Sequence, residues 1–424
     1  MNDSSVSITF RLRRVISIFI TVMPLDNERI SYYRVDKLLW RWKLHDGTDG
    51  CKIVPDIALS MDMAPPPLPR QPTPKTVPTK PAPKPPKPDA LDKMVDDIER
   101  VSNAISRFKT WLNTPDPPKA PKPPPIEKKK ETVPPFDLQE IPGAMRKLWM
   151  PVSAKLMERW FAGALNYSPT DDDEAAYINQ DGMPYPSEMY DTTTVKLDWV
   201  VKYKRAKAQY DALQKTEYLL TPKSLKSIGE ALFSLRAPYR EIDALDLCNG
   251  DLKELHKRFQ FQRTGVESSL SQKIGTFIAQ RAHNSGIPDD LTGALGSFNF
   301  YAAIGYVNFN QNGSHAAITS IIIYIKDNYT FTTEAAQPSQ YLGHWNRNGV
   351  VIVPASMAAV VAGIPWVDYP VAVGDTRIPG NVYYPIRNSS FREWQQHHNR
   401  GGDFVIFSDH RHITLREPIQ LRFT

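Results

Sequence analysis

The residues best suited to chemistry lie in the last third of the sequence, where charged and aromatic side chains follow apolar runs. The densest group is Asp409, His410, Arg411 and His412, directly after the apolar residues Phe404–Phe407. A carboxylate, two imidazoles and a guanidinium could supply a general acid, a general base and an anion-binding cation. The group therefore predicts a catalytic site, and hydrogen bonding that only orders loops is the alternative.

Three further candidates lie upstream in the same region. Asp327 and Tyr329 follow a strongly apolar run, and His344 lies in the polar stretch Gly343–Arg347 after the next loop. We expect these side chains to share a cleft with Asp409–His412 if the two segments lie side by side. The candidate catalytic residues are therefore Asp327, Tyr329, His344, Asp409, His410, Arg411 and His412.

Recognised catalytic motifs are absent from the sequence: there is no HExxH, no GxSxG and no glycine-rich phosphate loop. His412–Thr414 matches half of the paired motif of two-histidine phosphoesterases, but no second copy exists. The adjacent His397 and His398 lack the ββα pattern of a metal nuclease. The acidic run Asp171–Glu174 lacks the alternating spacing of a calcium loop, so it predicts a helix start or a solvated loop. No metal site is predicted, and no particular cofactor is indicated.

The element that must position these residues runs from Ser320 to Phe331. Ile321–Ile325 is a continuous apolar run of β-branched and aromatic residues, which predicts a strand buried on both faces. Phe298–Phe309 predicts a second strand, and Asn310–His315 a hairpin connection, so the two should pair antiparallel. Further strands are expected at Val350–Val353, Asp403–Phe407 and Ile419–Phe423, and a short helix at Ala355–Ala362. A second helix is expected at Phe391–His398, with Asn388–Ser390 as its cap and Gly401 and Gly402 as its stop.

The middle of the chain is predicted to be helical. Pro151 suits the first turn of a helix that continues to Ala162, after an earlier helical segment at Met145–Met150. Helical patterns follow at 204–217, 222–235, 251–261 and 267–284, whereas Thr194–Tyr203 alternates like a half-buried strand. The predicted fold class is α+β, with a helical middle segment packed against a mostly antiparallel C-terminal sheet.

The N-terminal third has a different character. Alternating segments at Val6–Leu12, Val15–Ile20 and Leu38–Leu44 predict a small β-rich piece. More than half of the 38 prolines then fall between Ala64 and Pro135, in two extended arms. The arms could be PxxP ligands or basic, solubilising linkers.

A heptad pattern lies between the arms and predicts an amphipathic helix of about 33 Å. Its apolar positions are Leu91, Met94, Ile98, Val101, Ile105, Phe108 and Leu112. Such a stripe needs a surface to cover it, either on the same protein or on a partner. We treat it as a candidate partner-docking helix.

Charge and cysteine usage narrow the function. The chain has a net charge of +6, but residues 291–424 hold 9 Lys+Arg against 8 Asp+Glu, which disfavours nucleic acid as a partner. Cys51 and Cys248 lie far apart in the sequence and predict no disulfide framework, in keeping with a cytoplasmic origin. No stretch approaches the roughly 18–20 apolar residues of a transmembrane segment.

Four segments carry a family resemblance over about residues 137–424: Asp137–Lys147, Pro151–Phe161, Tyr341–Asn346 and Arg400–Asp409. They are similar to an uncharacterised bacterial domain-of-unknown-function family found beside type VI secretion spike (VgrG) genes. The resemblance implies secretion cargo, such as a toxin used against neighbouring cells. It implies no agreed activity and no catalytic residues.

A second comparison follows from that setting. Colicin-M-type enzymes, which cleave a lipid-linked peptidoglycan precursor, carry an Asp-x-Tyr-Asp motif closely followed by His-Arg. Asp327–Tyr329 resembles the start of that motif, but Thr330 replaces the second acid, and His410 and Arg411 lie far downstream.

The sequence favours an antibacterial effector of a type VI secretion system that hydrolyses a cell-envelope component. The alternatives are a non-enzymatic adaptor or structural component of the secretion apparatus and, third, a nuclease toxin. Expected partners are the VgrG spike or an adaptor, reached through the N-terminal region, and a cognate immunity protein. The protein would be cytoplasmic in the producing cell and then be secreted or delivered into a target cell.

The expected organisation has five parts. They are a β-rich piece (1–63), a proline-rich linker (64–88), the heptad helix (89–114), a basic proline-rich linker (115–136) and an α+β effector-like domain (137–424), helical over 137–290 and β-rich over 291–424.

Overall fold

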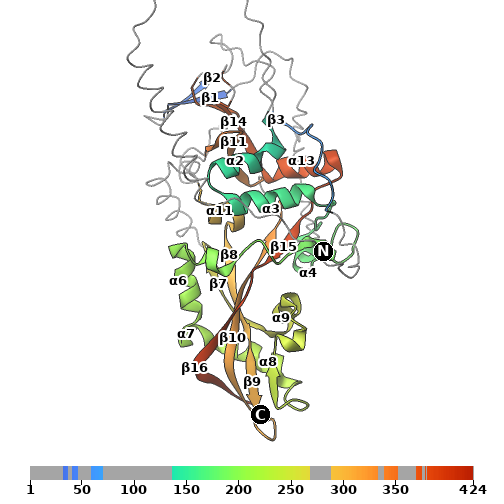
Figure 1. Ribbon diagram of the computed structural model, residues 1–424, viewed down its shortest axis with the longest axis vertical. Helices are drawn as coiled ribbons and strands as arrows, with labels where there is room; N and C mark the ends of the chain where they lie inside the picture. Colours follow the sequence, from blue (N-terminus) through green and yellow to red (C-terminus); the bar gives the residue numbers. More distant parts are fainter. Residues whose placement is uncertain are drawn as a thin grey trace, which may run out of the picture. The chain divides into compact units, whose positions relative to one another are not determined.

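The computed structural model places one long strand, β10 (His315–Tyr329), at the centre of an eight-stranded sheet (Figure 1). The structure describes residues 32–36, 41–45, 59–69, 136–267, 288–332, 339–351, 369–374, 378 and 380–423. Within β10, Ile321–Ile325 have no exposed surface at all. The predicted central strand is therefore confirmed, and it begins five residues earlier than the pattern indicated.

Strand β10 changes partners along its length. Its first half pairs with β9 (Tyr306–Phe309) and β16 (Arg411–Arg422), and its second half with β8 (Phe298–Ile304) and β15 (Phe404–Phe407). All four pairings are antiparallel. Both edges of the apolar run are thus bonded to other strands, which satisfies its backbone groups in a dry interior.

The rest of this sheet extends from those neighbours. Its order is β5-β15-β10-β8-β7, with β6 joined through β9; the added strands are β5 (Tyr190–Asp191), β6 (Glu241–Asp243) and β7 (Gln260–Val266). Only the short β15–β5 pairing in this sheet is parallel. The predicted α+β fold with a mostly antiparallel C-terminal sheet is confirmed.

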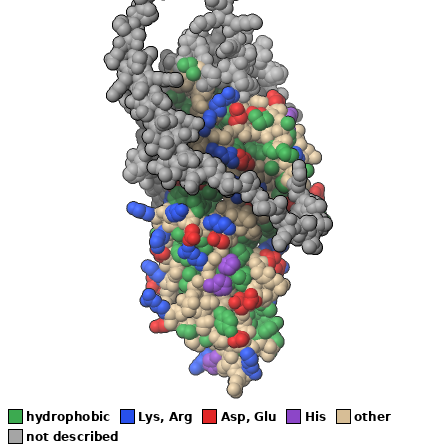
Figure 2. All heavy atoms as spheres, in the orientation of Figure 1, with side chains coloured by type: hydrophobic (Ala, Val, Ile, Leu, Met, Phe, Trp, Pro, Cys, Tyr) green, Lys and Arg blue, Asp and Glu red, His purple; other side chains and the backbone are tan. Residues whose placement is uncertain are grey.

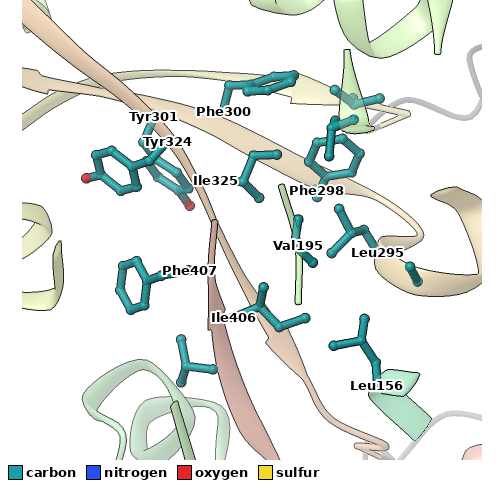
Figure 3. Close-up of a cluster of buried hydrophobic side chains, with 14 of the residues drawn as sticks. Leu156, Val195, Leu295, Phe298, Phe300, Tyr301, Tyr324, Ile325, Ile406 and Phe407 are labelled. Atoms are coloured by element: carbon teal, nitrogen blue, oxygen red, sulfur yellow. The ribbon is translucent and has the colours of Figure 1, made fainter. Parts of the chain in front are cut away.

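Side chains of β10 alternate between two covered faces, as Figure 3 shows. Ile325 points to the same side as Phe298 and Phe300, and Tyr324 points to the side of Tyr301 and Phe407. The helices that pack here are α3 (Pro151–Ala162), α6 (Lys204–Leu213) and α11 (Asp290–Leu295) on the first face and α9 (Leu252–Phe259) on the second. A sheet covered on both faces explains why the run is continuously apolar.

A second, six-stranded sheet lies beside these elements. Its order is β12-β11-β14-β13-β1-β2, with β1 (Tyr32–Asp36), β2 (Arg41–His45), β11 (Tyr341–Asn346), β12 (Gly349–Val351), β13 (Val371–Ala372) and β14 (Val382–Arg387). Strand β1 joins it by parallel pairing with β13. A third, two-stranded sheet pairs β3 (Leu59–Ser60) in parallel with β4 (Phe136–Asp137).

An aromatic cluster joins α3 to α13 (Asn388–His398), and the two helices lie close together in Figure 1. The Trp160 ring lies 5.4 Å from Phe391 and 5.6 Å from Trp394. Its indole N–H donates to the buried carboxylate of Asp403 at 2.9 Å, and Arg392 pairs with the same carboxylate at 2.6 Å. One buried acid thereby fastens two helices to the start of β15, because each donor would be left unpaired without it.

The remaining helices match the sequence expectations only in part. They are α2 (Ile141–Lys147), α4 (Asp171–Ala176), α5 (Leu197–Val200), α7 (Thr216–Leu219) and α8 (Pro222–Phe233), with short 3₁₀ turns at Leu138–Glu140, Ser187–Met189 and Asp246–Cys248. The helix expected at Met145–Met150 ends at Lys147, the helix expected over 204–217 is divided in two, and the helix expected over 251–261 ends at Phe259. Pro151 and Pro222 occupy first-turn positions. Thr170 caps α4 by accepting the Asp173 N–H, so of the two alternatives for Asp171–Glu174, a helix start or a solvated loop, the structure shows the helix start.

Several expectations are wrong in detail. Thr194–Tyr203 contains α5 rather than a strand, because Leu197 and Val200 are buried together on one turn. The strand predicted over Phe298–Phe309 is broken at Gly305, where a Cβ would lie 2.9 Å from the Ser320 carbonyl oxygen. Strand β16 begins at Arg411, so Arg411 and His412 lie on a strand and not in a loop.

Helix α13 also differs from its prediction. It begins at Asn388, where Ser390 Oγ accepts the Arg387 N–H at 3.3 Å, and it ends at Asn399, which has a left-handed φ of 50°. The stop therefore comes before Gly401. Outside the described residues lie the predicted strands Val6–Leu12 and Val15–Ile20, the heptad helix, both arms beyond Pro69, the Ala355–Ala362 helix and most of the 267–284 helix.

Two glycines let the chain cross itself beside α3. A Cβ on Gly163 would lie 2.9 Å from the Gly402 backbone nitrogen and 3.0 Å from its Cα. We therefore expect Gly163→Ala to lower the free energy of unfolding by about 1–3 kcal/mol, because neither backbone can yield cheaply. Chemical denaturation measures the change.

The control is Gly143→Ala in α2, where an added Cβ meets no atom within 4 Å. That substitution should leave stability equal or raise it by up to about 1 kcal/mol, since alanine is the better helix former. Equal stabilities for the two variants would contradict the close crossing.

Candidate functional site

A cavity of about 460 Å³ lies at the Tyr329 end of β10. Its apolar wall includes Met145, Met157, Leu295, Phe331, Trp345 and Phe391, which come from α2, α3, α11, the end of β10, β11 and α13. Its polar groups include Asp327, Asn328, Thr292, Gln340, Tyr341 and Glu267. An apolar cavity with few convergent polar groups is the usual form of a small-molecule or catalytic site.

Asp327 is the central polar residue of this wall. The alternation of β10 places Asp327 on the same face as Ile323 and Ile325, and this face of the sheet borders the cavity at Asp327. Among the described residues, no side chain forms a hydrogen bond or ion pair with its carboxyl group. Burial raises the pKa of Asp327 to about 8, and the Lys326 charge and the Asn328 backbone N–H offset only part of that rise. The group is therefore largely protonated at neutral pH.

Tyr329 lines the same cavity two residues further along the strand. Its ring stacks on Phe404 at 5.0 Å and meets the edge of Phe331 at 5.6 Å. Burial raises the pKa of its hydroxyl well above the ordinary value, so the phenol stays neutral. Of the seven predicted residues, the structure brings Asp327 and Tyr329 together in one cavity.

His344 lies on β11 but is not part of the cavity wall. Gly343 and Trp345 line the cavity, and the alternation of the strand directs His344 to the other side. Its side chain is fully buried, with Nδ1 bonded to the Tyr341 hydroxyl and Nε2 2.9 Å from the Tyr369 carbonyl oxygen. Burial lowers the pKa of His344 to about 4, so it is a neutral, structural hydrogen-bonding group at pH 7.

The cluster Asp409–His412 is also separate from the cavity. Arg411 pairs across the sheet with Ile323, four residues before Asp327, which corresponds to about 13 Å along the strand. Asp409 accepts the Leu197 N–H at 2.6 Å, and Arg411 forms an ion pair with Asp198. These two predicted catalytic residues therefore hold α5 against the sheet.

The two histidines of the cluster lie beside each other. The rings of His410 and His412 are 5.5 Å apart. Burial lowers the pKa of His410, and the neighbouring His412 lowers it further, whereas Asp409 opposes both effects. The predicted convergence of all seven residues on one cleft does not occur, because β15 and β16 bond to different halves of β10.

Sequence reasoning missed Glu267, at the end of β7. Its side chain is 7% exposed, it forms an ion pair with Arg205, and it lines the cavity that contains Asp327. Val266, which precedes Glu267, pairs with Phe298 of β8, and the backbones of β7 and β10 lie two strand spacings apart, about 10 Å. Glu267 has a positive φ of 56°, which is unusual for a residue with a side chain. The sequence predicts a helix over 267–284, so no sequence signal points to Glu267 as a cavity residue.

The described part of the chain offers no group of three or more His, Cys, Asp or Glu residues placed to hold a metal ion. Across the same residues, none of the helices has the length and apolarity needed to cross a membrane. Asp327 and Glu267 are the carboxyl groups of the cavity, and no described lysine or arginine lines it.

The fold and the cavity together define an α+β protein with an acid-bearing pocket at the end of a central antiparallel sheet. The chain belongs to the family of unknown function DUF6402, which matches residues 136–423. No curated protein and no solved structure matches the chain. The resemblance to a domain-of-unknown-function family is thereby confirmed in its extent, and the family description assigns no activity.

The raised pKa of Asp327 makes a prediction about stability. In the unfolded chain an aspartate has a pKa of about 3.9, so between about pH 4 and pH 8 the folded protein holds a proton that the unfolded chain has lost. The contribution of Asp327 to the free energy of unfolding is largest below about pH 4 and decreases as the pH rises to about 8. Asp327→Asn cannot ionise, so at pH 9 it should be more stable than the wild type by about 1–2 kcal/mol.

Urea denaturation at pH 5 and pH 9 measures this difference. The control Asp211→Asn changes an exposed acid of α6 that pairs only with Lys207 among the described residues, and it should leave the pH dependence unchanged. Parallel stability–pH curves for the wild type and Asp327→Asn would show that Asp327 titrates normally.

Proposed function

We propose that the cavity at the end of β10 is the active site of a hydrolase and that Asp327 is its general acid. The observation that carries the proposal is an acid in the wall of a largely apolar cavity with no bonding partner among the described side chains. Structural buried acids are normally satisfied, as Asp403 is by Trp160 and Arg392. An unsatisfied acid with a shifted pKa in a cavity is typical of a catalytic group.

The second carboxylate supports a hydrolytic mechanism. Asp327 would donate its proton to the leaving group, and Glu267, charged beside Arg205, would orient an attacking water or stabilise positive charge. A neutral acid and an ionised carboxylate in one site form the pairing that glycoside hydrolases use. The apolar wall formed by Met145, Met157 and Phe391 would exclude bulk water from the proton transfer.

The biological setting that we propose is antibacterial. This setting is what the resemblance drawn from the sequence implies, and the substrate would then be a cell-envelope component. The proline-rich arms and the heptad pattern over 89–114 would serve loading onto a VgrG spike or an adaptor. A cognate immunity protein would protect the producing cell.

Two other functions remain as alternatives. A non-enzymatic adaptor is favoured by the structural roles of His344, Asp409 and Arg411, which leave only part of the predicted set for chemistry. A nuclease is disfavoured, because no described basic side chain lines the cavity. Over the coloured part of the surface in Figure 2, basic and acidic side chains are interspersed rather than separated.

Growth of a susceptible bacterium that expresses the full chain tests the proposal. The chain is directed to the cytoplasm in one strain and to the periplasm in another. We expect toxicity in the periplasm and a loss of at least about 100-fold in killing for Asp327→Asn, because a general acid contributes about 10²–10⁴-fold to rate. Incubation of the purified chain with peptidoglycan, followed by mass spectrometry of released fragments, tests the chemistry directly.

The matched control is Asp211→Asn, which should remain as toxic as the wild type. Toxicity that is unchanged by Asp327→Asn would show that the cavity is not the active site. Absence of toxicity in both compartments would favour the adaptor.

A further inference from the structure

A short segment before the family-matched region lies along the domain without forming a helix or a long strand. Residues 59–69 begin with the two-residue strand β3 and continue as irregular chain through Ala64, Pro65, Pro66, Pro67, Leu68 and Pro69. Leu59 and Met61 pack against the hydrophobic core, and Pro65 and Pro66 are half-buried. We call this segment the strap.

Side chains of the domain hold the strap by its backbone. His398 Nε2 lies 2.7 Å from the Met61 carbonyl oxygen, so this nitrogen carries the proton and donates. The Asp137 carboxylate accepts the Met63 N–H at 3.0 Å, and the Gln139 amide donates to the Met63 carbonyl oxygen.

The proline part of the strap is held in the same way. Arg400 Nη2 donates to the Pro66 carbonyl oxygen at 2.8 Å. Bonds to the domain orient the Arg400 guanidinium, because it also donates to the carbonyl oxygens of Ala162 and Gly163 at 2.8 and 3.0 Å. Asp137 likewise accepts the Gln139 N–H at 2.9 Å. The recognising groups are therefore oriented by the domain itself and not by the strap.

The contacts define the chemistry of the ligand. The bonded strap groups include the carbonyl oxygens of Met61, Met63 and Pro66 and the N–H of Met63, so extended backbone is what the domain contacts. Only the Arg400 contact is made to a proline, whose fixed φ keeps this part of the chain extended at low entropic cost. The exposed strap side chains contribute little, since Met63 and Leu68 are 46% and 53% exposed. Pro66–Pro69 has the PxxP spacing, and domains that bind such segments use their preformed extended shape.

We propose that Asp137, Gln139, His398 and Arg400 form a binding site, here called the groove, for an extended peptide with a free N–H opposite Asp137, and that the strap is its ligand in cis. The groove is built by residues inside the family-matched region 136–423, whereas its ligand comes from outside it. The groove can therefore bind the strap as a separate peptide. The inference is independent of Asp327 and of the proposed hydrolysis.

The test uses the full chain with residues 61–69 replaced by a Gly-Ser segment of equal length. A fluorescent peptide of residues 61–69 is titrated in, and anisotropy reports binding. We expect saturable binding to the replaced chain and at least about tenfold weaker binding to the wild type, because its own strap occupies the groove. Gln139→Met and His398→Phe, made in the replaced chain, should each weaken binding about fivefold.

Gln214→Met is the matched control, since the amide of Gln214 bonds only within α6 among the described residues. It should bind the peptide like its parent. A folded replaced chain that does not bind the peptide would overturn the proposal, as would unchanged affinity in both groove variants.

Hydrogen exchange in the otherwise native chain decides the matter if the replaced chain does not fold. The Met63 amide should be protected in the wild type and should exchange at least about tenfold faster in Gln139→Met. Fast exchange of Met63 in the wild type would mean that the strap is not bound and would overturn the proposal.

Discussion

The fold depends on one constraint, the need to bury Ile321–Ile325 on both faces and both edges at once. Strands on either side satisfy the backbone groups, and helices on either face remove the side chains from water. Each of the four isoleucine side chains of the run stabilises the fold by about 1.5–3 kcal/mol when it is fully buried. The elements that cover the run come from distant parts of the sequence, so the run determines which segments must meet.

The same strand explains where the cavity forms. Beyond Ile325 the sequence changes to Lys326, Asp327 and Asn328 while the chain keeps its alternation, so a polar group is carried to an otherwise apolar face. Asn328 reaches out to Glu174 on α4. Asp327 has no comparable partner among the described side chains and meets the cavity instead. A polar residue on the buried face is thus a direct result of continuing a core strand by two residues.

The buried Asp403 and the partly buried Asp327 differ in their bonding partners, and their pKa values differ accordingly. Asp403 is fully buried, and burial raises its pKa to about 6, yet Arg392 and Trp160 limit the rise. Asp327 lacks such partners, and its pKa reaches about 8. The first acid therefore contributes to the packing of α3 and α13, whereas the second reduces stability at neutral pH. Proteins retain such a cost mainly at functional sites.

Much of the fold could be predicted from local patterns, and most of the site could not. The apolar run and Pro151 at a helix start are local signals, and both are confirmed. Asp409 bonds the Leu197 N–H, 212 residues away. Its place next to His410 in the sequence therefore gave no information about this contact. Asp327 and Tyr329 can be predicted as cavity residues because they directly follow the apolar run, whereas Glu267 cannot, because only the pairing of distant strands brings it to the cavity.

The pairing of β16 with β10 determines how the sheet responds to mechanical force. The two strands are antiparallel, and their register starts at His315 opposite Arg422, next to the C-terminus. Force applied between the Arg422 end of β16 and the His315 end of β10 acts on one end of the ladder, so it would load one backbone pair at a time and unzip β16 progressively. Force applied to opposite ends of the two strands would instead shear all the pairs together. The pairing is therefore mechanically weakest across its Arg422–His315 end.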